Sequence, residues 1–183
     1  MTNNMAELWD LYDLHGNLTD EKFVRDSDKP FPQDKYHIVV EIYTIHRGRL
    51  LLTKRDSRKP YGGLWEYTGG SVVAGEDSLT GASRELAEET GIVRDPSEFL
   101  PISSLLRIAR GGHLWRMDAY ALILPDDEPC PEVIYQEGET VDHIWLERGT
   151  ADAFIDSPAF VGHVAKRYHI VEDTLWKLAE MRK

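Results

Sequence analysis

Apolar residues recur along this chain with two periods, and each period predicts a kind of secondary structure. Short runs rich in Val, Ile, Leu and aromatic residues, bounded by Gly, Pro or charged residues, are typical of β-strands. Such runs predict strands at 8–12, 36–45, 49–53, 66–70, 100–108, 115–124 and 139–146. Apolar residues spaced by three and four predict helices at 78–90, 151–154 and 162–181. This order of elements indicates an α/β (α+β) fold in which a mixed β-sheet lies between helices.

The segment 1–35 is predicted to be a hairpin followed by a loop. Residues 7–19 carry a strand pattern and then the turn signal His15-Gly16-Asn17. Residues 20–35 are polar and contain two prolines, so we expect a connecting loop there. Another turn is predicted at residues 110–113, between two strands.

The segment 70–92 holds the densest group of carboxylates. Its helix should begin after Asp77 or Ser78 as N-cap and end at Gly91. Its buried stripe is predicted to be Leu79, Ala82, Leu86 and Thr90.

Three glutamates of this helix border the apolar stripe. At ~100° per residue, Glu85, Glu88 and Glu89 share an arc of roughly 100° and repel one another. A solvated acidic face is the alternative interpretation, but these side chains lie beside the core stripe, and Gly81 one turn earlier leaves space. We therefore expect a hard cation such as Mg²⁺, which prefers oxygen ligands.

Cations and glycines precede this helix. Lys54, Arg55, Arg58 and Lys59 are four cations within six residues, and they either clamp phosphate oxygens or form a solvated turn. Either Tyr61 or Trp65 is a candidate for stacking on a ligand. The alternative for Trp65 is packing in the core. The pair Gly69-Gly70 permits close backbone approach, so the Gly69 carbonyl is a candidate metal ligand. We take Arg55, Arg58, Lys59 and Trp65 as candidate substrate-binding residues.

The segment also resembles a known signature, G-x5-E-x7-R-E-U-x-E-E-x-G-U, where U is aliphatic. The matching positions are Gly70, Glu76, Arg84, Glu85, Leu86, Glu88, Glu89, Gly91 and Ile92. On these residues the chain resembles the Nudix hydrolases. The resemblance implies an α/β/α sandwich that binds Mg²⁺ or Mn²⁺. It also implies hydrolysis, by water attack at phosphorus, of a diphosphate joining a nucleoside to another group.

The resemblance also implies roles for single residues. Glu88 and Glu89 correspond to the main metal ligands, and Glu85 to a third ligand or the general base. Arg84 would orient these glutamates, while Glu76 would brace the loop or join the metal shell. In many relatives the base lies in a later loop; Glu139 is the candidate here, with Glu137 next.

Two alternatives share this fold. Residues 36–37 and 54–65 also resemble isopentenyl-diphosphate isomerases, but Thr68-Gly69-Gly70-Ser71 stands where those enzymes carry a cysteine and a histidine. Of their metal-binding histidines only His37 has a counterpart here. The other alternative is a ligand-binding or regulatory module that has lost activity, although every glutamate of the signature is present.

Composition limits the partners. The 183 residues carry 42% hydrophobic side chains and a net charge of −11, which argues against a general affinity for nucleic acid or anionic membranes. One cysteine, Cys130, excludes an internal disulfide and fits a reducing cytoplasm, and no secretory signal is evident. We expect one domain over residues 1–183 and a small diphosphate as partner. The final helix carries an apolar stripe for core packing or for a homodimer.

Overall fold

The computed structural model describes residues 7–25, 27–108 and 112–182. These described residues form β-strands, three α-helices and one short 3₁₀ helix, η1 (Pro96–Glu98). The strands are β1 (Leu8–Asp13), β2 (Leu18–Val24), β3 (Lys35–His46), β4 (Arg49–Arg55), β5 (Trp65–Glu66), β6 (Thr68–Ser71), β7 (Leu100–Ile108), β8 (Leu114–Leu124) and β9 (Thr140–Glu147). The helices are α1 (Ser78–Thr90), α2 (Arg148–Ile155) and α3 (Gly162–Met181).

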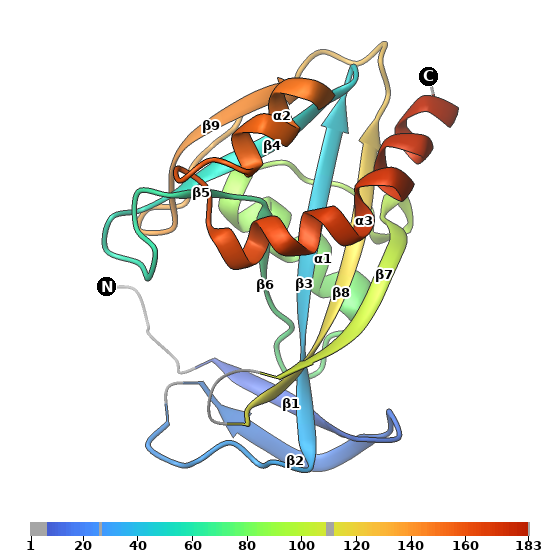
Figure 1. The fold of residues 1–183 in the computed structure, drawn as a ribbon. Coiled ribbons are helices and arrows are strands. Elements are labelled where there is room, and N and C mark those ends of the chain that lie inside the picture. Colours follow the sequence, from blue (N-terminus) through green and yellow to red (C-terminus); the bar gives the residue numbers. More distant parts are fainter. Residues whose placement is uncertain (1–6, 26, 109–111, 183) are drawn as a thin grey trace.

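Strand β3 is the centre of the mixed sheet (Figure 1). Along one edge it runs parallel to β8 over its whole apolar length, Tyr36 to His46. Along the other edge it pairs antiparallel with β1, β6 and β4 in turn. Parallel neighbours require a long crossover connection. In this chain that connection carries β4 and α1, so the sheet topology brings α1 against β3.

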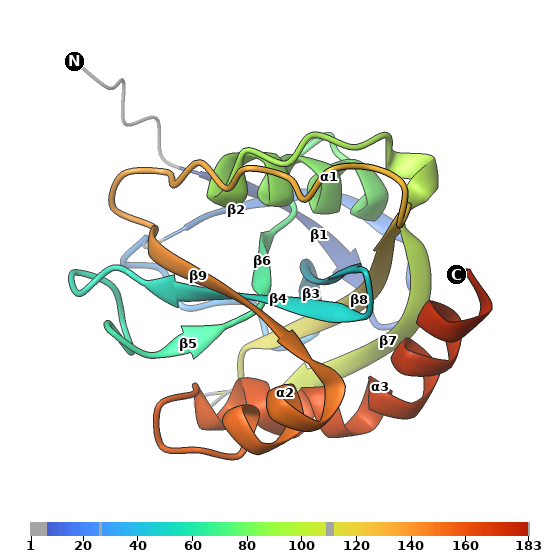
Figure 2. The ribbon, with the colours of Figure 1, turned by 90° about the horizontal axis from the view of Figure 1, so that it is seen from above.

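Two helical layers enclose the sheet, with α1 on one face and α2 and α3 on the other (Figure 2). Alternate residues of β3 serve the two cores, because successive side chains of a strand point to opposite faces. Val40 and Ile42 pack with Leu86 of α1, whereas Tyr43 and Ile45 pack in the cluster that includes α3. The α/β/α sandwich with a mixed sheet is therefore confirmed.

Helix α3 contributes its apolar stripe to the core. Val164, Tyr168, Val171 and Leu175 are all buried, and Leu178 packs against the same cluster. Of the two interpretations of this stripe, core packing is therefore the one the structure supports.

Helix α1 begins and ends as the sequence predicts. The Asp77 carboxylate accepts a hydrogen bond from the Thr80 amide at 2.8 Å, and Gly91 takes φ 71° and donates to the Ala87 carbonyl. The space expected beside Gly81 is filled, however. A Cβ there would lie 2.9 Å from Cγ2 of Val72, so Gly81 serves the packing of α1 on the residue after β6 rather than ligand access.

The loop expected at 20–35 is wrong in its first part, because β2 extends to Val24. Most side chains of β2 are exposed, so its residues are mainly polar and do not alternate between apolar and polar as a half-buried strand does. Pairing with β1 and the contact of Phe23 with Trp9, 6.1 Å between ring centroids, hold it in the sheet. The turn predicted at 110–113 lies partly outside the described residues. No helix within the described ranges is long and apolar enough to cross a membrane.

Candidate functional site

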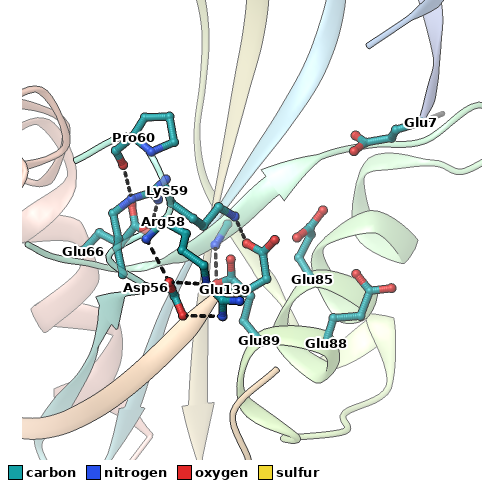
Figure 3. Close-up of polar contacts among 12 residues, drawn as sticks. Glu7, Asp56, Arg58, Lys59, Pro60, Glu66, Glu85, Glu88, Glu89 and Glu139 are labelled. Atoms are coloured by element: carbon teal, nitrogen blue, oxygen red, sulfur yellow. Dashed lines mark hydrogen bonds and ion pairs between the residues drawn. The ribbon is translucent and has the colours of Figure 1, made fainter. Parts of the chain in front are cut away.

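A polar hollow of about 700 Å³ opens between α1, the loop after β4 and the N-terminal hairpin. We call it the glutamate pocket. Its acidic lining residues are Glu7, Glu85, Glu88, Glu89 and Glu139. Its basic lining residues are Arg25, Arg55, Lys59 and Arg84. Gly69, Gly70 and Ser71 complete the lining, and Figure 3 shows Glu85, Glu88 and Glu89 of α1 across from the segment that carries Lys59.

Arg84 holds the acidic side chains of α1 in place. Its guanidinium donates to Glu76 at 2.9 Å, to Glu85 at 3.0 Å and to Glu88 at 2.9 Å. A further bond at 3.0 Å reaches the Ser71 carbonyl. One cation therefore offsets the repulsion among these carboxylates and ties the helix to the end of β6 and to the loop after it.

Two glycines of β6 admit the carboxylates to the floor of the pocket. A Cβ on Gly70 would lie 2.3 Å from the Glu85 carboxyl, so only glycine leaves room for that group. A Cβ on Gly69 would meet the Val40 carbonyl at 2.4 Å, and the Gly69 amide donates to Glu89 at 3.4 Å. The glycine pair thus places the strand backbone directly beside Glu85 and Glu89.

Burial raises the pKa of two of these glutamates. Glu89 is 7% exposed, and its pKa lies well above the usual value, through burial first and then the charges of Glu66 and Glu85. Burial likewise raises the pKa of Glu85. A buried group of anions held this way is short of positive charge, and a bound cation would relieve it.

The metal that the resemblance implies needs oxygen donors that converge on one point. As the side chains stand, no three His, Cys, Asp or Glu residues of the described chain converge closely enough to hold an ion. Arg84 and Lys59 pair with carboxylates of the same pocket instead. The donors that α1 offers are all carboxylate oxygens, which Mg²⁺ and Mn²⁺ prefer, so the residues fit the group chemically.

The opposite wall comes from two loops. Lys59, after β4, forms an ion pair with Glu139, which lies just before β9. The segment leading to Glu139 runs along α1, where the Ile134 amide donates to the Thr90 carbonyl at 2.8 Å (Figure 2). Arg55 pairs with Glu66 and donates to the Pro60 carbonyl at 2.8 Å. The tertiary structure therefore brings Glu139, Lys59 and Arg55 to the α1 glutamates.

Some candidates lie outside the lining of this pocket. Arg58 is exposed and binds Asp56 through two bonds of 2.8 Å, and the charge of Glu137 lies near it rather than in the pocket. Trp65 packs edge-on against Phe154 at 5.7 Å as part of the core. Glu76 is not among the lining residues and contacts the site through Arg84 and the Val73 amide.

The structure adds three side chains that the sequence did not indicate. Glu7 and Arg25 of the N-terminal hairpin are bonded at 2.6 Å and line the pocket. Glu66 is largely buried beside Arg55, and burial raises its pKa. No local pattern marks the hairpin pair. Glu66 lies four residues before the signature, at the end of a short strand, which is the one available hint.

The isomerase alternative lacks support in this geometry. Cys130 is exposed in the loop after β8 and is not among the residues that line the pocket. His37 stacks on Trp9 at 4.0 Å, and burial lowers its pKa to about 3, so it packs as a neutral side chain.

Comparison with known sequences points to one family. The NUDIX domain family model matches residues 35–160. The uncharacterized Nudix hydrolase lmo0368 of Listeria monocytogenes is 34% identical over 94 residues, which are 50% of this chain and 54% of the relative. The lin0387 protein of Listeria innocua matches to the same extent. The match therefore spans about half the length of these curated relatives.

Solved structures share the fold. DR0079 from Deinococcus radiodurans superimposes with a TM-score of 0.70 at 19% identity, over 90% of this chain and 99% of that one. The NUDIX domain of Shewanella oneidensis NrtR, complexed with ADP ribose, superimposes with a TM-score of 0.60 at 19% identity, over 84% of this chain and 94% of that one. A bifunctional NMN adenylyltransferase/ADP ribose pyrophosphatase from Francisella tularensis, complexed with AMP and Mn ion, superimposes with a TM-score of 0.61 at 17% identity. The match covers 76% of this chain and 42% of that one. Since the family model spans most of the sequence and the fold agrees, the chain belongs to the Nudix family.

Proposed function

We propose that this protein hydrolyses a diphosphate linkage joining a nucleoside to another group, with the help of Mg²⁺ or Mn²⁺. The observation that carries the proposal is the convergence of Glu85, Glu88 and Glu89 with Lys59 and Glu139 in one pocket. Family membership and the ligands named for two similar structures, ADP ribose and AMP, support the same class of substrate.

The ion would be held by Glu88 and Glu89, with Glu85 and the Gly69 carbonyl as further donors. When bound, the ion would neutralise charge on the phosphate oxygens and would lower the pKa of a water molecule bound to it. Glu76 contributes by fixing Arg84, which in turn orients the ligand carboxylates.

The remaining residues position the substrate and the proton. Arg55 and Lys59 would bind phosphate oxygens once the substrate competes with Glu66 and Glu139 for them. Glu139, released from Lys59, would then accept the proton of the attacking water, and Glu85 is the second candidate for that role. Arg58 and Trp65 keep a supporting part, since they shape the loop and the core beside the pocket.

A substrate panel tests the proposal. Release of the nucleotide product is measured by chromatography for nucleoside triphosphates, nucleotide sugars, ADP-ribose, dinucleoside polyphosphates and coenzyme A, with Mg²⁺, with Mn²⁺ and with chelator. We expect metal-dependent release from at least one compound, abolished in Glu88→Gln and unchanged in Glu180→Gln, an exposed glutamate of α3. Release from none of them would favour the binding or regulatory module.

We also propose a cytoplasmic location and, as a hypothesis without an assigned surface, a homodimer. The small-molecule substrate remains the expected partner, rather than nucleic acid or a membrane. Sedimentation velocity at micromolar protein checks the dimer, and a monomer at every concentration would contradict it.

A further inference from the structure

A second hollow, of about 520 Å³, lies on the other side of the loop that carries Lys59. We call it the basic pocket and define it by Tyr61, Arg107, Trp115, His163, Lys166 and Ile170. Its volume is in the range of small-molecule sites. Of these positions only Tyr61 is a candidate ligand contact in the sequence, and none belongs to the family signature.

Three segments far apart in sequence build this pocket. Arg107 and Trp115 are directly paired across β7 and β8, so their side chains share one face of the sheet. His163, Lys166 and Ile170 are spaced by three and four residues, so they share one face of α3. Tyr61 closes the third side, with its ring 5.0 Å from that of His163.

The chemistry of the lining is basic and aromatic. Arg107, Lys166 and the adjacent Arg167 line the hollow, whereas no carboxylate of the described residues does. Arg167 is already bonded to the buried Glu41 at 2.7 Å. Within the described chain, Arg107 and Lys166 have no ion-pair partner, and the buried Nε of Arg107 has no hydrogen-bond acceptor. In a protein of net charge −11, two unpaired cations beside Trp115 are a specific local arrangement.

Backbone strain marks the residue that joins the two pockets. Tyr61 has φ 60°, in the left-handed region that side chains other than glycine rarely adopt. Tight turns fix it there: the Gly62 amide donates to the Lys59 carbonyl at 2.9 Å, and the Leu64 amide to Tyr61 at 3.1 Å. The residue is nevertheless 58% exposed. The chain thus holds an exposed aromatic ring at the edge of the pocket at a cost in backbone energy.

The basic pocket adjoins the glutamate pocket. Pro60 lines the glutamate pocket and the next residue, Tyr61, lines the basic pocket. The charge of Arg55, which lines the glutamate pocket, helps to lower the pKa of His163 after burial and Arg167. A ligand whose diphosphate lies at Lys59 can therefore extend past Tyr61 toward α3.

From this arrangement we propose that the basic pocket binds the nucleotide part of the substrate. A planar base packs against Tyr61 and Trp115, and Arg107 and Lys166 donate to phosphate or base oxygens. This rests on the proposed function, because it assigns the group attached to the diphosphate that the glutamate pocket would cleave.

Binding and hydrolysis are measured separately, so that the two proposals can fail separately. The metal-free protein is titrated with AMP, GMP, CMP and UMP, one at a time, by calorimetry and tryptophan fluorescence. Arg107→Gln and Lys166→Gln are compared with Lys177→Gln, an exposed lysine on the same helix. Loss of a charge-assisted bond should raise the Kd of the preferred nucleotide roughly tenfold in the first two variants and leave it unchanged in the third.

Hydrolysis of a nucleotide-linked diphosphate and of inorganic tripolyphosphate, which has no base, completes the test. The two pocket variants should raise KM roughly tenfold for the first compound only, with kcat within a few-fold. Nucleotide binding that these variants weaken, without hydrolysis of any compound, keeps the basic pocket and removes the proposed function. Hydrolysis of the nucleotide-linked diphosphate with parental KM in both pocket variants keeps the proposed function and removes the basic pocket as the nucleotide site. This inference is overturned if none of the four nucleotides binds. It is also overturned if the two pocket variants raise KM equally for tripolyphosphate and for the nucleotide-linked diphosphate.

Discussion

The two pockets on either side of the Lys59 loop handle charge in opposite ways. In the glutamate pocket nearly every cation is already paired: Arg84 with three glutamates, Arg55 with Glu66 and Lys59 with Glu139. In the basic pocket Arg107 and Lys166 have no such partner among the described residues, and apolar side chains stand exposed beside them. The first pocket is a fixed arrangement of opposing charges, and the second has donors ready for a ligand.

This contrast fits a division of labour. Groups that take part in the reaction must be held in position before substrate arrives, because positioning and electrostatics lower the barrier. Groups that select a substrate lose less if they meet the ligand without first breaking an internal ion pair. Variants that affect one pocket and leave the other intact therefore test the comparison.

The largest effect is expected from Glu89→Gln. The change removes a proposed metal ligand, so turnover should fall by roughly a thousandfold or more, since such ligands support several kcal/mol of charge stabilisation in the transition state. The melting temperature should not fall, because glutamine is neutral and replaces a buried acid whose ionised form is disfavoured by burial. Steady-state kinetics and thermal melts measure both, with nucleotide binding as the control for the basic pocket. Parental turnover in this variant would show that the reaction does not use Glu89.

A smaller loss is expected from Gly70→Ala. The added Cβ would lie 2.3 Å from the Glu85 carboxyl and must displace it, so turnover should drop by roughly ten- to a hundredfold. Gly149→Ala is the matched control, because nothing lies within 4 Å of a Cβ at that position. If both glycine variants keep parental kinetics, Glu85 has no positional requirement and is neither ligand nor base.

The pH dependence of stability separates the pockets further. Glu89 has a raised pKa in the native state, so that state binds more protons than the unfolded chain above the ordinary value of 4.5. The stability that its protonation gives is present below that value and is lost as pH rises through the raised pKa. The metal-free parent should therefore lose more stability between pH 5 and pH 8 than Glu89→Gln does.

Denaturant unfolding at several pH values measures this difference, and other titrating groups cancel because both proteins contain them. Lys166→Gln should keep the parental dependence, since this change lies in the other pocket and leaves Glu89 in place. Identical profiles for the parent and Glu89→Gln would mean that Glu89 titrates normally and that the native pocket is wetter than the structure indicates.

The smallest effect is expected from Trp65→Phe. Because Trp65 packs against Phe154 in the core, the change should reduce the free energy of unfolding by about 1–2 kcal/mol and change KM less than threefold. Denaturant melts and kinetics on the preferred substrate check it. A large rise in KM with unchanged stability would restore Trp65 as a direct substrate contact.

Local signals in the sequence predicted much of the site. The caps of α1, its buried stripe and the clustering of its glutamates depend on residues within one or two turns, so spacing alone reveals them. The hairpin strand β2 was missed because its polar residues take strand form only through pairing with β1. The space beside Gly81 was misjudged because Val72, nine residues earlier, fills it.

The sequence by itself determined the helix, its carboxylates, the apolar strands and the family, since each is written in short-range periodicity or in fixed spacings. Only the tertiary structure decided which distant charges meet: Arg84 with Glu76, Lys59 with Glu139, and Arg107 with Lys166 beside Tyr61 and Trp115. The physical reason is that ion pairs and pockets depend on distances of a few ångströms. The pairing of strands and the packing of helices set these distances, and no local pattern records them.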